Sequence, residues 1–322
     1  MMAILLTAVF GVSAQNSQVA TLSHEGQITS FYSASAFKDA YAAAQDGDVI
    51  TLSDGLFESV ENGIDKILTV RGAGMMPDSN PTIITGNMSI GYGPKENIAG
   101  GFTAEGIMFN GDITIGSSFY TVSADDVRFV KCWFSHLNLE VAQNFTSLHC
   151  IYIYLKTNGL SNSYFSNSYL GIDNGIEHAN FNNCVVMKFG VDKINSSSLK
   201  NCIVVDSDSG SRSSINSNTL VSNCYYIGSS QTPFKNSFST TNVVKNDIKT
   251  EDILTEDGHT DWKLKPEIAE TWLGDDGTQV GMHGGAIPFD PTPTNPQITK
   301  FNVANKTTAD GKLSVEIEVK AD

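Results

Sequence analysis

The residues with the clearest capacity for chemistry are a lysine and two aspartates in the middle of the chain. Lys188 and Asp206 each follow by four residues a cysteine of a sequence motif that recurs along the chain, and Asp208 lies close by. Matching positions of a repeat become neighbours when the repeats stack. Carboxylates are ligands that suit Ca²⁺, and a lysine with a perturbed pKa can act as a general base. A lysine beside an aspartate is equally typical of a surface ion pair, so both interpretations stay open.

The recurring motif is an asparagine, followed by a cysteine or serine and then by a run of apolar residues. Its key residues are Cys132, Cys150, Ser163, Cys184, Cys202 and Cys224. They follow one another at roughly twenty-residue intervals, a spacing typical of coils that each bury a face on the next. The sequence therefore predicts an all-β solenoid, a parallel β-helix.

In such a fold, side chains of one type form ladders. Asn162, Asn183, Asn201 and Asn223 precede the key residue, where each amide can hydrogen-bond to the one above. The inward ladder then contains Cys132, Cys150, Cys184, Cys202 and Cys224. Because stacked side chains point the same way, we expect buried free thiols. Disulfides are the alternative, since exported proteins commonly form them.

The residue after each key position should face outward. This outward stripe contains Trp133, Ile151, Tyr164, Val185, Ile203 and Tyr225. Sugar faces stack on aromatic rings, so Trp133, Tyr164 and Tyr225 are the candidate ligand-binding residues. The alternative is that a loop or the C-terminal hairpin covers the stripe, because long exposed apolar patches are uncommon.

The ends of the solenoid need shielding from strand addition. Residues 35–45 have helical apolar spacing, so we expect a capping helix at one end, and we expect residues 232–289 to close the other. A proline-rich linker follows Pro288, and Ile298–Val303 and Leu313–Val319 alternate as two strands of a hairpin.

The helix and the strand 46–52 that follows it resemble the N-terminal cap of pectin-lyase-like, right-handed parallel β-helix proteins. Residues 261–266 and 277–281 are similar to the closing segment of secreted bacterial members, and the tail after Gly284 resembles uncharacterised exported proteins of Bacteroidetes. The resemblance covers about residues 30 to 322 and rests on cap and coil patterns. It implies the right-handed fold. Its polysaccharide-lyase branch implies carboxylate-bound Ca²⁺ and a basic residue that removes a proton beside a uronate carboxylate, for which Lys188, Asp206 and Asp208 are the candidates.

The N-terminus has the features of a secretory signal. A short apolar run ends at Val12-Ser13-Ala14, although no Lys or Arg precedes it. We expect cleavage after Ala14, with a buried strand as the alternative, and no lipoprotein anchor because no cysteine is near. The expected division is a signal peptide at 1–14, a lead-in at 15–34, the capped β-helix at 35–290, and the linker with its hairpin at 291–322.

The net charge of -15 argues against nucleic acid as a partner. Nothing after the signal is apolar enough to span a membrane. His136, His149 and His178 have no metal-ligand spacing, and His149 holds a ladder position, so we expect no metal or cofactor except Ca²⁺ in the lyase alternative. The predicted function is that of a secreted or cell-surface, non-enzymatic protein whose extended face binds a polysaccharide or a surface protein. The alternatives are a polysaccharide lyase or glycosidase, and a structural component of a surface assembly.

Overall fold

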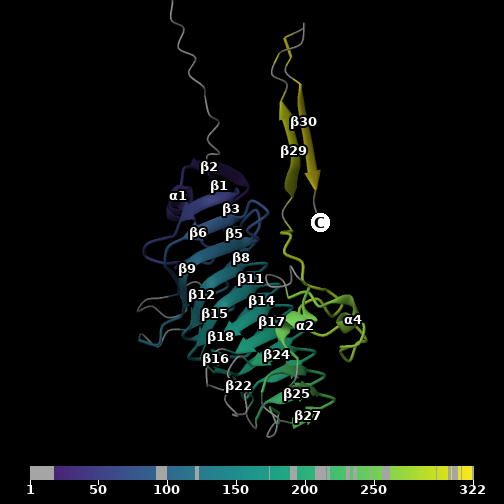
Figure 1. The fold of residues 1–322 in the computed structure, drawn as a ribbon. Coiled ribbons are helices and arrows are strands. Elements are labelled where there is room, and N and C mark those ends of the chain that lie inside the picture. The colour runs from purple at the N-terminus through teal and green to yellow at the C-terminus, as the bar shows by residue number, and fades with distance from the viewer. Residues whose placement is uncertain are drawn as a thin grey trace, which may run out of the picture.

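The protein is a right-handed parallel β-helix with a capping helix and a C-terminal hairpin (Figure 1). The computed structural model describes residues 18–91, 100–119, 123–173, 175–188, 194–206, 215, 218–229, 233–234, 238–246, 248–255, 262–294, 296–303, 306, 311–312 and 314–320. The fold class predicted from the repeats is confirmed.

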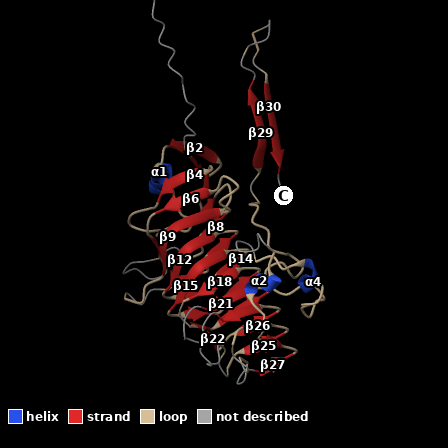
Figure 2. Ribbon diagram, viewed as in Figure 1, coloured by secondary structure: helices blue, strands red, loops and turns tan. Residues whose placement is uncertain are grey.

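Two long sheets run the length of the solenoid, and a third side carries short strands (Figure 2). Sheet A contains, in spatial order, β2 (Gln27–Tyr32), β1 (Val19–His24), β3 (Val49–Leu52), β5 (Thr69–Arg71), β8 (Thr103–Glu105), β11 (Arg128–Val130), β14 (Thr146–Leu148), β17 (Ser163–Ser166), β20 (Ala179–Asn182), β23 (Ser198–Lys200), β25 (Leu220–Ser222) and β27 (Phe238–Thr240). Sheet B contains β4 (Gly55–Glu58), β6 (Thr82–Thr85), β7 (Met88–Ile90), β9 (Ile107–Ile115), β12 (Trp133–Leu139), β15 (Ile151–Thr157), β18 (Tyr169–Ile172), β21 (Val185–Lys188), β24 (Ile203–Asp206), β26 (Tyr225–Ile227) and β28 (Val243–Lys245). The third side contains β10 (Ala124–Asp125), β13 (Ala142–Gln143), β16 (Leu160–Ser161), β19 (Ile176–Glu177) and β22 (Ile194–Asn195).

A residue with a left-handed backbone joins sheet A to sheet B in successive coils. These residues are Lys131, His149, Asn167, Asn183, Asn201 and Asn223, with φ between 46° and 55°. Asparagine tolerates this conformation better than most residues, which explains its recurrence in the sequence. A second row of left-handed turns leads into sheet A at Asp126, Asn144, Asn162, His178 and Ser196.

The second row of turns shows that the motif at Asn162 was wrongly grouped with the motifs at Asn183, Asn201 and Asn223, which lie in the first row. Asn162 precedes a strand of sheet A, and its amide donates to Asn144 Oδ1 at 2.7 Å. The residue equivalent to Asn183 in this coil is Asn167, which precedes Ser168 and Tyr169 of sheet B. Residues 162–164 and 167–169 both read Asn-Ser-Tyr, so the motif alone could not show which of them precedes sheet B.

Inside the coils, aromatic rings stack along the solenoid axis. Phe134 lies between Phe109 and Tyr152, with ring centroids 4.7 Å and 5.1 Å apart and interplanar angles of 10°. All five cysteines are buried and free. Burial raises the pKa of the Cys132 and Cys184 thiols, which keeps these thiols protonated as small packing groups.

The N-terminal end is closed by helix α1 (Ala36–Ala43), which buries Phe37 and Tyr41. The lead-in forms strands β1 and β2, which pair antiparallel with each other, and β1 also pairs antiparallel with β3. Helices α2 (Thr250–Ile253) and α4 (Pro266–Ala269) are short. No helix in the described residues is long and apolar enough to cross a membrane. The predicted hairpin is present as β29 (Gln297–Val303) paired with β30 (Val315–Lys320).

Residues 248–255 and 262–294, which together we call the strap, run back along the outside of the solenoid toward its N-terminal end (Figure 1). The strap contacts successive coils in reverse order. Asp275 contacts Lys200 and Asn201, and Met282 and Gly284 contact Asn167. Asp290 then contacts His149 and Lys131, and Thr294 contacts Glu105. The expectation that 232–289 closes the second end was therefore wrong for the strap, which covers a side. Asn201, whose amide was expected to hydrogen-bond to the amide of the neighbouring coil, instead donates to Asp275 Oδ1 of the strap and accepts from the Asp275 backbone N–H.

Replacing Phe134 with alanine should lower the free energy of unfolding by about 3–5 kcal/mol, because the side chain is fully buried in the axial stack. Ile28→Ala is the control, since Ile28 is 73% exposed, and its effect should stay within about 0.5 kcal/mol. Denaturant unfolding measures both. Equal effects of the two variants would contradict the stacked core.

Candidate functional site

The apolar stripe on the outside of sheet B is covered. Its in-register members are Trp133, Ile151, Tyr169, Val185, Ile203 and Tyr225. The strap packs Trp272 on Tyr225 and Trp262 on Tyr169, with ring centroids 4.5 Å and 5.3 Å apart. Ile151 is only 1% exposed. The stripe is thus a second hydrophobic core, and it is the strap that closes it.

The three aromatic residues predicted to bind a ligand do not form one surface. Tyr164 lies in β17 of sheet A, in register with Thr146 and Asn180, and is 38% exposed. Trp133 and Tyr225 lie on sheet B, where both are partly buried against the second core. The prediction that Tyr164 shares one outward stripe with Trp133 and Tyr225 was wrong, because Asn162 belongs to the turn that leads into sheet A.

The predicted catalytic cluster is only partly described. Lys188 and Asp206 are neighbours in register, as the repeat predicted, and Asp206 accepts a hydrogen bond from the Tyr226 hydroxyl at 3.1 Å. Lys188 also aligns with Ile172, a residue of the main core. Asp208 and the side chain of Lys188 lie outside the described part of the chain.

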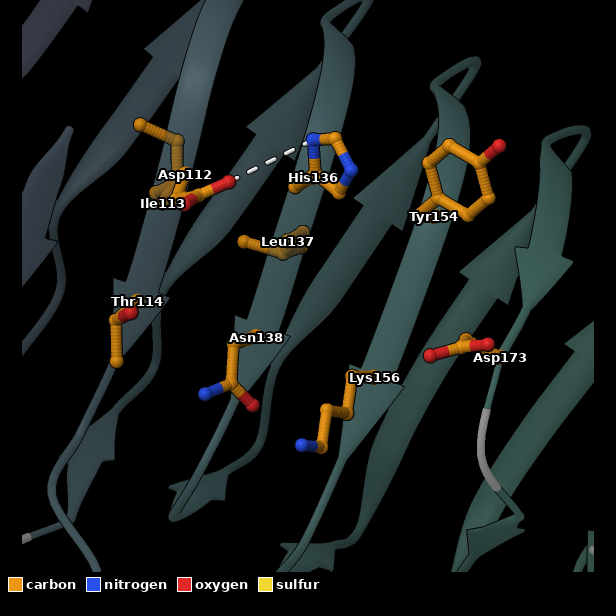
Figure 3. A pocket seen from close by; sticks show the side chains of 9 residues that line it. All are labelled: Asp112, Ile113, Thr114, His136, Leu137, Asn138, Tyr154, Lys156 and Asp173. Carbon is orange, nitrogen blue, oxygen red and sulfur yellow. Dashed lines mark ion pairs between the residues drawn. The ribbon is translucent and has the colours of Figure 1, made fainter. Parts of the chain in front are cut away.

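An open groove lies on sheet B beyond the edge of the covered stripe (Figure 3). It has a volume of about 260 Å³ and is lined by Asp112, Ile113, Thr114, His136, Leu137, Asn138, Tyr154, Lys156 and Asp173. The strands that form it are irregular, because the register shifts between Phe134 and His136 and again between Tyr152 and Leu155. Such bulges bend a strand and redirect its side chains, so the outward residues change from apolar to polar here.

A stacked pair of rings forms one wall of the groove. The His136 ring lies against the Tyr154 ring with centroids 4.8 Å apart and an interplanar angle of 13°. His136 Nδ1 lies 3.5 Å from Asp112 Oδ1, and both side chains are more than half exposed. Tyr154 is 44% exposed. The pair thus offers an aromatic surface to solvent with a carboxylate at its edge.

A polar row runs beside the ring pair, formed by Thr114, Asn138 and Lys156 in register. Asn138 Nδ2 donates to Glu140 Oε1 at 3.2 Å. Ser118 donates to Glu140 through its backbone N–H and its hydroxyl, and these bonds lower the pKa of Glu140, which keeps the carboxylate ionised at neutral pH. An adjoining hollow lined by Glu61, Asn87, Met88, Ser89, Asp112, Thr114 and Glu140 extends the groove toward the N-terminal coils.

The groove combines two aromatic rings with hydroxyl, amide, carboxylate and ammonium groups, which can contact the apolar face of a ligand and hydrogen-bond to its polar edge. Within the described ranges no group of three or more His, Cys, Asp or Glu side chains is arranged to hold a metal ion. Sequence reasoning missed His136 and Tyr154, although both follow a ladder cysteine by four residues. That shared spacing was the available signal, and it was applied only to Lys188 and Asp206.

The fold and groove define a parallel β-helix protein with one covered and one open strip on sheet B. No family model and no curated protein matches the chain. Among solved structures, the chain is similar to that of QnrB1, a plasmid-mediated fluoroquinolone resistance protein, with a TM-score of 0.30 and 12% sequence identity. That match covers 59% of this chain and 87% of the QnrB1 chain.

Trp133→Ala and Tyr154→Ala should differ in their effect on stability. Trp133 packs against the second core, so its removal should cost about 1–3 kcal/mol. Tyr154 contributes to an open wall, and its removal should cost less than about 1 kcal/mol. Chemical denaturation with both variants checks this. A larger loss for Tyr154→Ala would show that the ring pair is structural rather than available.

Proposed function

We propose that this protein binds an extended polysaccharide in the groove on sheet B, as an exported and non-catalytic β-helix protein. The observation that carries the proposal is the stacked and exposed His136–Tyr154 pair beside Asn138 and Lys156. Sugar rings present apolar C–H faces and polar hydroxyl edges. An aromatic surface flanked by hydrogen-bonding groups complements both.

The direction of the groove suits a chain rather than a single sugar. The two adjoining hollows share Asp112 and Thr114 and together cross β7, β9, β12 and β15. Neighbouring parallel strands lie about 4.8 Å apart, so successive rungs present groups at a spacing close to that of sugar units. A ligand in this position would lie across the strands, along the axis of the solenoid.

The proposed export rests on the N-terminal sequence. The apolar run before Ala14 and the small residues at Val12-Ser13-Ala14 support a cleavable secretory signal. A secreted or surface location would bring the groove into contact with extracellular polysaccharide or with glycans of another cell.

A catalytic alternative has one observation in its favour. Lys156 lines the same groove as two carboxylates, Asp112 and Asp173. A lysine with nearby carboxylates is the composition expected of a lyase, and two carboxylates are that of a glycosidase. Under this alternative the site lies at Lys156 rather than at Lys188 and Asp206.

The binding test compares two exposed tyrosines. A glycan array identifies a bound polysaccharide, and affinity electrophoresis then compares wild type with Tyr154→Ala and Tyr164→Ala. Tyr154→Ala should weaken binding about tenfold or more, equivalent to about 1.4 kcal/mol. Tyr164→Ala should bind as wild type does, because Tyr164 is similarly exposed but lies on sheet A. Equal affinity of all three proteins would refute the site.

The catalytic alternative is tested on the bound polysaccharide by following ultraviolet absorbance of unsaturated products and release of reducing ends. The binding proposal predicts no increase in either signal. Product formation that Lys156→Ala abolishes, without loss of binding, would establish a lyase or glycosidase in its place.

A further inference from the structure

The strap is fastened near its end by hydrogen bonds to two buried ionisable side chains of the solenoid, His149 and Lys131. The backbone N–H of Asp290 donates to His149 Nδ1 at 3.0 Å. Lys131, in the preceding coil, donates to the Asp290 carboxylate at 3.1 Å and to the Thr292 carbonyl. His149 and Lys131 are only 7% and 8% exposed. The contact is therefore a hydrogen-bonded junction that is buried on the solenoid side, while the Asp290 side chain of the strap is 48% exposed.

The junction requires an uncharged imidazole. A ring nitrogen can accept a hydrogen bond only when it carries no proton, and protonated histidine donates from both nitrogens. Protonation at Nδ1 would leave the Asp290 N–H without its acceptor. It would also place a second positive charge beside Lys131, in surroundings that desolvate both groups.

The charged and titratable groups around His149 come from two elements, the preceding coil and the strap. Lys131 faces it from the preceding coil, and Asp290 faces it from the strap. His283, also in the strap, contacts the Phe289 ring, which in turn stacks over His149 at 6.2 Å. The equivalent turn of the following coil carries Asn167, which has no charge. Asp290 is therefore the acidic group that can oppose protonation.

We propose that His149, Lys131 and Asp290 form an acid-sensitive latch, which holds the strap over the apolar stripe at neutral pH and loosens it on acidification. The segment released is the part of the strap that contacts the coils at Asn167, His149 and Lys131. Its release exposes Ile151 and the half-buried Trp133 beside it.

The pH range in which the latch loosens follows from the directions in which the pKa values of His149 and Asp290 are shifted. Burial lowers the pKa of His149, so the latch is intact above the ordinary value of about 6.5 and weakens as pH falls from there toward the lowered pKa of the folded protein. Burial alone would raise the pKa of Asp290, but hydrogen bonds from Thr292 and the charge of Lys131 outweigh it and lower that pKa. Asp290 thus keeps its charge while His149 titrates.

The test is hydrogen exchange of strap peptides from neutral to acidic pH, corrected for intrinsic exchange rates. Wild type should lose protection at the Phe289 and Asp290 amides, by up to about tenfold per pH unit at the limiting slope. His149→Asn should remove this pH dependence, because asparagine does not titrate and already occupies the equivalent turns. His178→Asn is the control, since His178 is exposed and also left-handed, with φ of 56°, and it should behave as wild type does.

Two results would overturn the latch. One is the same loss of protection in His149→Asn as in wild type. The other comes from NMR titration of the wild-type histidines, which needs no variant to fold. The midpoint of His149 should coincide with the loss of strap protection, and a strap that loosens while His149 remains neutral would assign the effect to another group.

Discussion

The left-handed turn between sheet A and sheet B is the constraint on which the rest of the structure depends. In the coils from Lys131 to Asn223, one residue at this position has positive φ. Because the turn is repeated at the same place, each strand lies directly over its predecessor and hydrogen-bonds to it in parallel register. The axial stack of Phe109, Phe134 and Tyr152 is a consequence of that alignment.

The same alignment produces an apolar column on the outside of sheet B, and the strap covers it. Coils in register present an apolar column on the outside of sheet B as well as inside, and an open column of this kind would invite association. The strap covers it with Trp262 and Trp272 and is held by the turn side chains themselves, at Asn167 and Asn201. Where the strands bulge, the column changes from apolar to polar, and the groove with His136 and Tyr154 remains open. Covered and open strips thus follow from one repeated geometry.

The sequence predicted the solenoid, the capping helix and the hairpin because each depends on local or periodic signals. It could not predict the strap's path, since Asp275 and Asp290 meet their partners only after the chain has reversed along the solenoid. The prediction of a site at Lys188 and Asp206 counted four residues from their cysteines as if every strand of the sheet were regular. The shift after Tyr152 breaks that count, so Lys188 aligns with Ile172 of the core rather than continuing the column of Tyr154. The groove was missed because the four-residue spacing was not followed back to Cys132 and Cys150, and because the bulge that places Lys188 in another column leaves no period in the sequence.

The central claim is that sheet B has one strip closed by the strap and one strip open to a ligand. Hydroxyl-radical footprinting with and without a bound polysaccharide tests both halves in one measurement. The account predicts that ligand protects His136 and Tyr154, while Tyr164 on sheet A and Trp272 in the strap react equally in both states. Protection of Tyr164 or Trp272, with Tyr154 unchanged, would contradict it.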